Sequence, residues 1–100
     1  TERVYWLTKD PKTKLINKIN KQDVFDYKEW KPVGTKGQHT RAFPEKMVED
    51  FLKVFPKAKL ILDPFMGSGT VAKVSKQMNR NYIGFEREKS FVKLAHKRLV

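Results

Sequence analysis

Apolar residues recur at helical spacing in two parts of the chain. The first pattern predicts an amphipathic helix that has Pro44 at its first position, where a proline is tolerated, and that Pro56 ends. Its apolar positions, spaced i, i+3, i+4 and i+7, are Val48, Phe51, Leu52 and Phe55. A second pattern predicts a helix from about Glu88 to the end of the chain. Its apolar positions are Phe91, Leu94, Ala95 and Leu99.

Two short apolar runs lie between these helical patterns. KLILD, Lys59–Asp63, and NYIGFE, Asn81–Glu86, are typical of buried strands. The residues between them, from Val71 to Met78, have a helical composition. Strand, glycine turn, helix, strand and helix form a βαβα unit, which implies parallel strands with a right-handed crossover. The predicted fold class is therefore α/β.

The first part of the chain is less regular. Arg3–Leu7 is aromatic and β-branched, which predicts a short strand, and the turn residues of Lys9–Lys12 end it. Lys12–Lys21 is compatible with a strand, a weak helix or a loop, and Asp23–Trp30 alternates in part like a further strand.

Charge and composition narrow the class of protein. The chain has 22 Lys and Arg residues against 11 Asp and Glu, a net charge of +11, which attracts polyanions and makes nucleic acid the expected partner. No run approaches the roughly 20 apolar residues of a membrane-spanning helix, and the sequence lacks a basic amphipathic helix with large apolar anchors. Cysteine is absent, which excludes disulfides and thiolate metal sites. We predict an intracellular, cytoplasmic protein without a metal site or a membrane partner.

The turn after the first predicted strand contains Gly67, Ser68 and Gly69. Gly67 permits a backbone conformation that is unfavourable with a β-carbon, and Gly69 would let a ligand approach the main chain. Glu86 ends the next strand, and its carboxylate can accept hydrogen bonds from both hydroxyls of a ribose. This predicts an adenosine-containing cofactor, the alternative being a chain-reversing turn beside a solvated acid.

Asp63 bears on the choice of cofactor. A dinucleotide would place its pyrophosphate at the start of the helix after the turn, where a carboxylate at the end of the strand is unfavourable. S-adenosylmethionine instead carries a sulfonium, an ammonium group and a ribose, so Asp63 favours it over NAD. A nicotinamide-dependent oxidoreductase stays open as an alternative, because a glycine turn followed by an acid also occurs there.

The two strings LILDPFMGSGTVAKV, Leu60–Val74, and RNYIGFERE, Arg80–Glu88, resemble the cofactor half of the DNA amino-methyltransferases, which methylate adenine N6 or cytosine N4. Asp63–Thr70 is close to the signature of that family. The preceding segment, His39–Leu52, resembles the one that closes over the methionine end of the cofactor, and this order is similar to the circularly permuted β group. The resemblance implies a Rossmann-like S-adenosylmethionine-dependent methyltransferase fold, incomplete in this chain.

The resemblance also implies roles for individual residues. Glu86 would bind the ribose hydroxyls, and Asp63 would lie near the amino-acid end of the cofactor. The full set of cofactor-binding residues it implies is His39, Phe43, Pro44, Asp63, Phe65, Gly67, Ser68, Gly69 and Glu86. Phe65 could instead be a core residue, and Phe43 with Pro44 could serve only to start a helix. Residues 38–100 would form the S-adenosylmethionine-binding part.

Residues 1–37 would then hold a strand and a basic segment like a target-recognition region. Four lysines of this segment would face DNA phosphates, unless they form only a solvated face. These are Lys12, Lys14, Lys18 and Lys21.

One motif of the family is missing. Its members stabilise the target amino group with an (Asp/Asn/Ser)-Pro-Pro-(Tyr/Phe/Trp) loop, and this chain contains no Pro-Pro pair. In the β group that loop lies upstream of the region that begins here at Thr1. The resemblance therefore implies the C-terminal part of a site-specific restriction-modification DNA methyltransferase, inactive alone, whose catalytic loop is in a removed N-terminal segment or a partner chain. The alternative is a non-catalytic module that binds cofactor and DNA.

Overall fold

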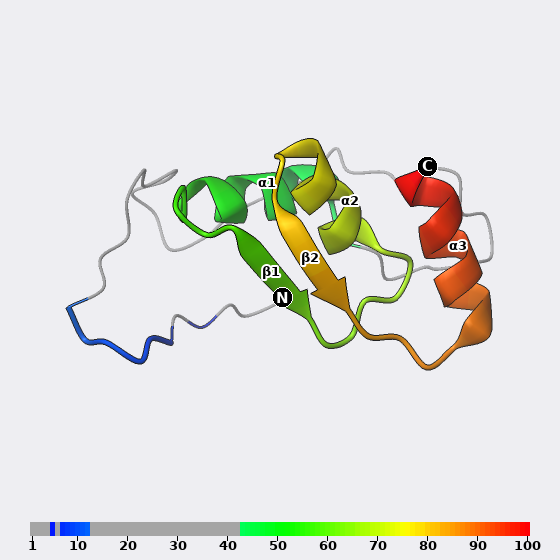
Figure 1. Cartoon of the computed structure of the whole chain (residues 1–100), viewed down its shortest axis with the longest axis horizontal. Helices are drawn as coiled ribbons and strands as arrows, with labels where there is room; N and C mark the ends of the chain where they lie inside the picture. Colours follow the sequence, from blue (N-terminus) through cyan, green and yellow to red (C-terminus); the bar gives the residue numbers. More distant parts are fainter. Residues whose placement is uncertain (1–4, 6, 13–42) are drawn as a thin grey trace.

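The structure is a computed structural model that describes residue 5, residues 7–12 and residues 43–100 (Figure 1). The helices and strands of this part are, in chain order, α1 (Glu45–Lys53), β1 (Leu60–Asp63), α2 (Thr70–Gln77), β2 (Asn81–Gly84) and α3 (Lys89–Leu99). The predicted βαβα order is confirmed, with the predicted amphipathic helix ahead of it. Both strands are shorter than predicted.

The two strands pair in parallel, as predicted. Leu60 lies opposite Asn81 at the start of the ladder, and Asp63 lies opposite Gly84 at its end. Because the strands end in register, the segments that follow them leave the sheet at the same edge. This edge therefore brings together the turn after β1 and the segment after β2.

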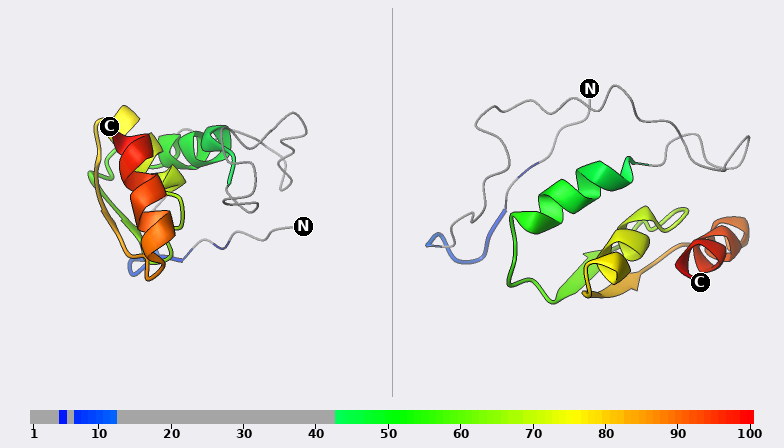
Figure 2. Two further views of the ribbon diagram at one scale, coloured as in Figure 1. Left: turned by 90° about the vertical axis from the view of Figure 1, so that its right-hand side faces the viewer. Right: turned by 90° about the horizontal axis from the view of Figure 1, so that it is seen from above.

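The helices pack around α2. This helix lies against both strands, while α1 and α3 each pack against α2, which lies between them when the molecule is seen from above (Figure 2). Val48 and Leu52 of α1 and Val74 of α2 form the buried core cluster. Partly buried Ile61, Val71 and Met78 pack against this cluster.

The ends of α1 differ slightly from the prediction. Pro44 is the residue before the helix, with ψ 132°, so Glu45 takes the first helical position. At the other end, the guanidinium of Arg80 donates hydrogen bonds to the carbonyl oxygens of Leu52 (2.7 Å) and Phe55 (2.8 Å). Each of these carbonyl oxygens also accepts a main-chain N–H, from Phe55 and Ala58 respectively, both at 3.1 Å. Arg80 therefore adds a second donor to each and ties the end of α1 to the start of β2.

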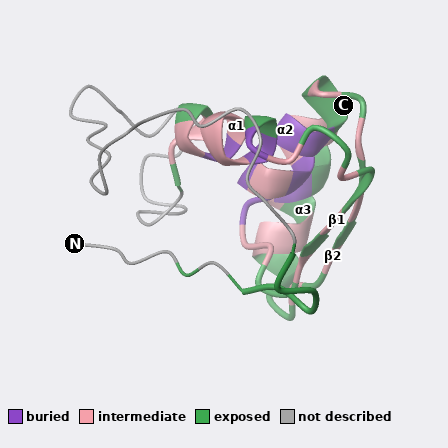
Figure 3. Ribbon diagram, turned by 90° about the vertical axis from the view of Figure 1, so that its left-hand side faces the viewer, coloured by how far each residue is buried: buried purple, intermediate pink, exposed green. Residues whose placement is uncertain are grey.

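One face of the sheet is apolar and exposed. Leu60 and Leu62 of β1 are 58% and 62% exposed, and Ile83 of β2 is 46% exposed. Figure 3 shows the strands at the edge of the molecule with the helices on one side of them. Parallel strands are usually covered on both faces, so the described residues are consistent with a partial α/β fold.

Only part of the N-terminal region is described. Tyr5 and Leu7 are exposed and lie outside any strand, so the strand predicted at Arg3–Leu7 is not supported at these two positions. The turn predicted at Lys9–Lys12 is present, and the carboxylate of Asp10 accepts a hydrogen bond from the N–H of Lys12 at 2.9 Å. Among the described residues, none of the helices has the length and apolar character needed to cross a membrane.

The remaining predictions for this region lie outside the described residues. They concern His39, Lys14, Lys18, Lys21 and the segment Asp23–Trp30. The division of the chain at residue 37 likewise stays a prediction.

Candidate cofactor-binding site

Main-chain hydrogen bonds hold the two strand exits side by side. Beyond the ladder, the N–H of Phe85 donates to the carbonyl of Asp63 (3.0 Å), and the N–H of Met66 donates to the carbonyl of Phe85 (2.8 Å). The Asp63 carboxylate accepts a hydrogen bond from the N–H of Phe65 at 3.1 Å, which bends the chain directly after β1. The turn after β1 is therefore fixed against the segment that carries Glu86.

Glu86 lies directly beside the glycine turn. One carboxylate oxygen, Oε2, accepts the N–H of Gly67 at 2.8 Å, and the other, Oε1, accepts the N–H of Glu88 at 3.0 Å. The N–H of Glu88 and then that of Gly67 are the main interactions that lower the pKa of Glu86 below its ordinary value, and burial opposes them. The carboxylate is therefore ionised at neutral pH. Each oxygen keeps a lone pair that can accept a further hydrogen bond.

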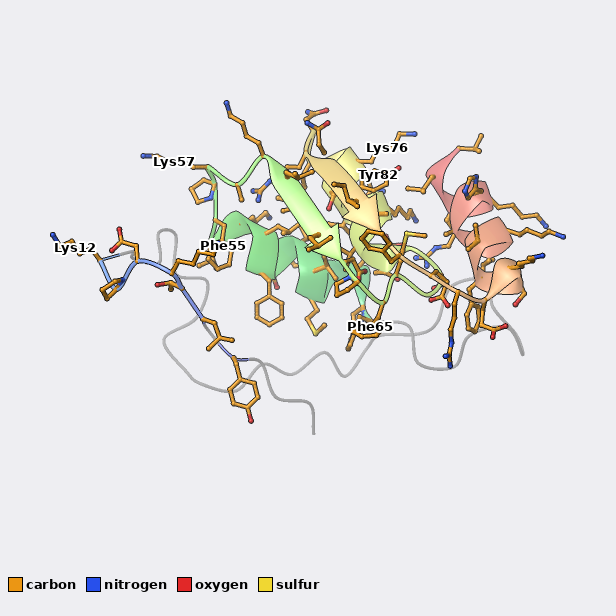
Figure 4. The ribbon with its side chains drawn as sticks, turned by 60° about the horizontal axis from the view of Figure 1, so that its bottom comes forward. Lys12, Phe55, Lys57, Phe65, Lys76 and Tyr82 are labelled. Atoms are coloured by element: carbon orange, nitrogen blue, oxygen red, sulfur yellow. The ribbon has the colours of Figure 1, made fainter. Side chains whose placement is uncertain are left out.

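An open cavity of about 550 Å³ lies beside this carboxylate. It is lined by Pro64, Phe65, Phe85, Glu86 and Arg87. The rings of Phe65 and Phe85 are 88% and 59% exposed, and Figure 4 shows Phe65 at the end of the strands. The alternative that Phe65 is a core residue is therefore wrong. Apolar rings next to one fixed carboxylate match the two halves of a nucleoside, a flat base and a sugar with hydroxyls.

The glycines of the turn have different reasons to be glycine. Gly67 has φ 54° and Gly69 has φ 83°, values that L-residues rarely adopt. A β-carbon on Gly69 would lie only 2.8 Å from the β-carbon of Ala95, so α3 occupies the space on that side. The prediction that the missing side chain of Gly69 admits a ligand is therefore not supported on that side. A contact of its main chain with a cofactor stays a prediction.

Three charged residues join the helices next to the turn. Nη1 of Arg98, on α3, donates to the carbonyl oxygen of Ser68 (3.0 Å), to the Ser68 hydroxyl (2.9 Å) and to the Thr70 hydroxyl (3.1 Å). Its Nη2 donates to Oε1 of Glu45, on α1, at 3.2 Å, and Nζ of Lys73, on α2, donates to the same oxygen at 2.7 Å. We call Glu45, Lys73 and Arg98 the Arg98 cluster.

The Arg98 cluster fixes the start of α1 near the turn. Because Glu45 follows Pro44 directly, the segment predicted to enclose the cofactor enters its helix beside Ser68 and Thr70. Phe43 is 49% exposed at this point. A contact of Phe43 or Pro44 with a cofactor stays a prediction. Pro44 does start α1, because its carbonyl oxygen accepts the N–H groups of Met47 and Val48.

Sequence reasoning missed six residues of this region: Pro64, Phe85 and Arg87 in the cavity, and the Arg98 cluster. For two of these residues the sequence contains a signal that could have identified them. Phe85 alternates with Gly84 and Glu86 at the end of the strand, and Arg98 lies three positions after the buried Ala95, on the inner face of its helix. A cation on an inner face requires acceptors, and the polar residues Ser68 and Thr70 supply them.

The pKa of Glu45 predicts a pH dependence of stability. Hydrogen bonding and charge from Lys73, followed by Arg98, hold this pKa below its ordinary value of 4.5, and burial opposes the shift. A carboxylate with a depressed folded pKa stabilises the fold above its unfolded pKa, and this contribution is lost as the pH falls through the folded pKa. Glu45→Gln should therefore cost about 1 kcal/mol at pH 7, a small value because water screens this partly exposed group.

Thermal unfolding of the parent chain and of Glu45→Gln, measured from pH 7 to about pH 3, would check this. The difference in Tm should be largest at neutral pH and should vanish at the acid end. A difference that does not change with pH would mean that the carboxylate charge of Glu45 contributes nothing.

Fold and site together define a class: an α/β chain with a glycine turn and an acidic residue at the carboxyl ends of parallel strands. Comparison with known proteins identifies the family within this class. Residues 1–97 match the N6/N4-type family model described as DNA methylase. The chain belongs to the N6/N4 DNA methylase family.

The chain is similar to several curated methyltransferases. It is 34% identical to the type II methyltransferase M2.DpnII of Streptococcus pneumoniae, over 99% of this chain and 42% of that protein. It is 44% identical to the orphan methyltransferase M.BamHII of Bacillus amyloliquefaciens, over 62% of this chain and 24% of that protein. The chain thus spans less than half the length of these two relatives.

A solved structure with a similar fold is that of M1.HpyAVI in complex with SAM. It superposes with a TM-score of 0.58 at 38% identity, over 64% of this chain and 32% of that one. The predicted Rossmann-like methyltransferase fold, present in part, is therefore confirmed.

Proposed function

We propose that this chain is the S-adenosylmethionine-binding part of a DNA amino-methyltransferase that methylates the exocyclic amino group of adenine (N6) or cytosine (N4). The observation that carries the proposal is the ionised carboxylate of Glu86, held by Gly67 at the mouth of an apolar cavity. The resemblance to M1.HpyAVI, which was solved with SAM, supports the choice of cofactor.

The residues present fit this cofactor. Glu86 would accept hydrogen bonds from the ribose hydroxyls with the lone pairs that Gly67 and Glu88 leave free. Phe65 and Phe85 would contact the adenine ring, since aromatic side chains pack well on flat bases. Asp63 at the end of β1 would lie toward the positively charged amino-acid end. Bound there, S-adenosylmethionine supplies the electrophilic methyl group.

The catalytic loop of the proposed enzyme would lie outside this chain. The 100 residues contain no Pro-Pro pair, so a longer form of the protein or a partner chain would supply the groups that hold the target amino group. The base would be flipped out of the helix before transfer. The lack of cysteine does not oppose this chemistry, because direct transfer to nitrogen needs no covalent intermediate on the protein.

Calorimetric titration with S-adenosylmethionine, and separately with NAD, tests cofactor binding. Binding of the first and not of the second supports the proposal, and the reverse result would indicate a nicotinamide-dependent oxidoreductase. Transfer of a labelled methyl group to DNA would then be measured with the chain alone and with any chain that co-purifies with it. Activity restored by a partner with the Pro-Pro loop supports the enzyme. Cofactor binding without activity in any pairing would identify a non-catalytic module.

The basic segment provides a separate prediction about DNA. Lys14→Ala combined with Lys18→Ala should weaken DNA binding and lower the slope of log affinity against log salt by about 1 to 2, because each phosphate contact releases counterions. Affinity for S-adenosylmethionine should not change. The matched control is Lys57→Ala combined with Lys59→Ala, which removes two exposed lysines between α1 and β1, of which Lys57 is labelled in Figure 4. An equal change of slope in the control would show that only net charge matters.

A further inference from the structure

We propose that Arg98 is a positioning residue for the cofactor site: it holds the glycine turn in its ligand-binding shape through Ser68 and Thr70. This inference rests on the proposed function, because the turn is taken to be a cofactor site. Arg98 is not among the residues that line the cavity. Its effect on a ligand would be transmitted through the turn.

The contacts of Arg98 with the turn are buried. Ser68 is 1% exposed and Thr70 is 5% exposed, and the Nη1 group reaches the Ser68 carbonyl and both hydroxyls within 3.1 Å. A hydrogen bond from a charged donor is stronger than one between neutral groups. The guanidinium therefore stabilises this particular orientation of the peptide group that follows Ser68.

The turn requires such a constraint because of its composition. Ser68 lies between two glycines at positive φ, and glycine has more accessible backbone conformations than any other residue. On one side, the N–H of Gly67 must point at Glu86 to make its 2.8 Å hydrogen bond. Arg98 holds the peptide group that follows Ser68, the next residue, so Glu86 and Arg98 constrain the turn at two consecutive residues.

A substitution of Glu45 can distinguish an effect of Arg98 on the shape of the turn from an effect on the stability of the fold. Glu45 binds Nη2 of Arg98, whereas the contacts with the turn are made by Nη1, and it also binds Lys73. Loss of its charge should weaken the attachment of α1 to α2 and α3. The Nη1 contacts with Ser68 and Thr70 would remain, since a glutamine at position 45 still offers an acceptor oxygen.

The decisive experiment compares Arg98→Lys with Glu45→Gln in the 100-residue chain. A lysine at position 98 keeps the positive charge for Glu45 but has no planar fork to reach several acceptors of the turn. We expect Arg98→Lys to weaken S-adenosylmethionine binding about tenfold in calorimetry and also to lower Tm, because buried acceptors of the turn lose a donor. Glu45→Gln should bind within about twofold of the parent chain. Lys97→Gln, an exposed neighbour on α3, is the control and should change neither quantity.

Amide hydrogen exchange gives a readout that a purely stabilising residue would not change. In Arg98→Lys the amides of Gly67 and Gly69 should exchange faster while those in the middle of α2 keep their protection. In Glu45→Gln the turn amides should keep the exchange rates of the parent chain.

The outcomes are distinguishable. If the parent chain does not bind S-adenosylmethionine, the proposed function fails. If the parent binds and Arg98→Lys binds equally well, the positioning role is wrong. It is also wrong if affinity falls in proportion to Tm in both variants. Should Arg98→Lys not fold, Thr70→Val removes one acceptor at nearly constant volume, and an affinity loss below about twofold there would overturn the inference.

Discussion

Gly69→Ala is expected to destabilise the folded chain by about 3 kcal/mol, a large part of the total stability of a small domain. Two effects add. An L-residue at φ 83° is strained by about 1–2 kcal/mol. The new β-carbon would also lie 2.8 Å from the β-carbon of Ala95 and 3.3 Å from its α-carbon, so α3 would have to move. Urea unfolding followed by circular dichroism measures the difference.

A double-mutant cycle with Ala95→Gly separates the two causes. Ala95→Gly alone should cost about 1 kcal/mol, since glycine is unfavourable within a helix. In the double variant the closest clash is absent, so the two changes together should cost less than their sum, by about 1 kcal/mol or more. Strict additivity would show that backbone strain alone accounts for the effect and that α3 does not pack on Gly69 in solution.

Local signals in the sequence predicted most of the described fold. The apolar spacing of α1 and the runs KLILD and NYIGFE placed the elements to within a few residues, because burial of one face and chain-breaking residues act over short distances. Pro44 was displaced by one position, which is the usual uncertainty of a helix end. The predicted strand ran to Glu86, but β2 ends at Gly84. Phe85 and Glu86 lie against the turn after β1 and not against a paired strand, so the ladder does not continue to them.

The candidate site was predictable in part. The position of Glu86 beside the glycine turn followed from the parallel strands alone, since both strands end at one edge. The contacts of Arg98 did not, because they join α3 to residues 28 and 30 positions earlier, a separation for which local periodicity gives no information. The sequence also did not predict that position 69 must be glycine because of packing. Ala95 is far from Gly69 in the sequence and contacts it only once α3 has packed on α2.

Glu86→Ala is expected to weaken S-adenosylmethionine binding about 10- to 100-fold, because the ribose hydroxyls would lose a charged acceptor. The substitution also removes the acceptor for the N–H groups of Gly67 and Glu88. The affinity of Glu86→Gln for S-adenosylmethionine should lie between that of the parent chain and that of Glu86→Ala, since its amide offers one acceptor oxygen where the carboxylate has two. Glu88→Ala is the matched control, because it keeps the main-chain N–H that Glu86 binds and removes only an exposed side chain.

Ligand analogues decide whether the affected contact is the ribose. An analogue of the cofactor without the 2′-hydroxyl should bind the parent chain more weakly than the intact compound, because the carboxylate of Glu86 loses a donor. In Glu86→Ala the two compounds should bind alike, since no acceptor remains for that hydroxyl to contact. If the parent chain does not discriminate between them, Glu86 serves only to hold Gly67 and Glu88. The glycine turn would then be a structural feature of the sheet edge, and the apolar cavity would need another explanation.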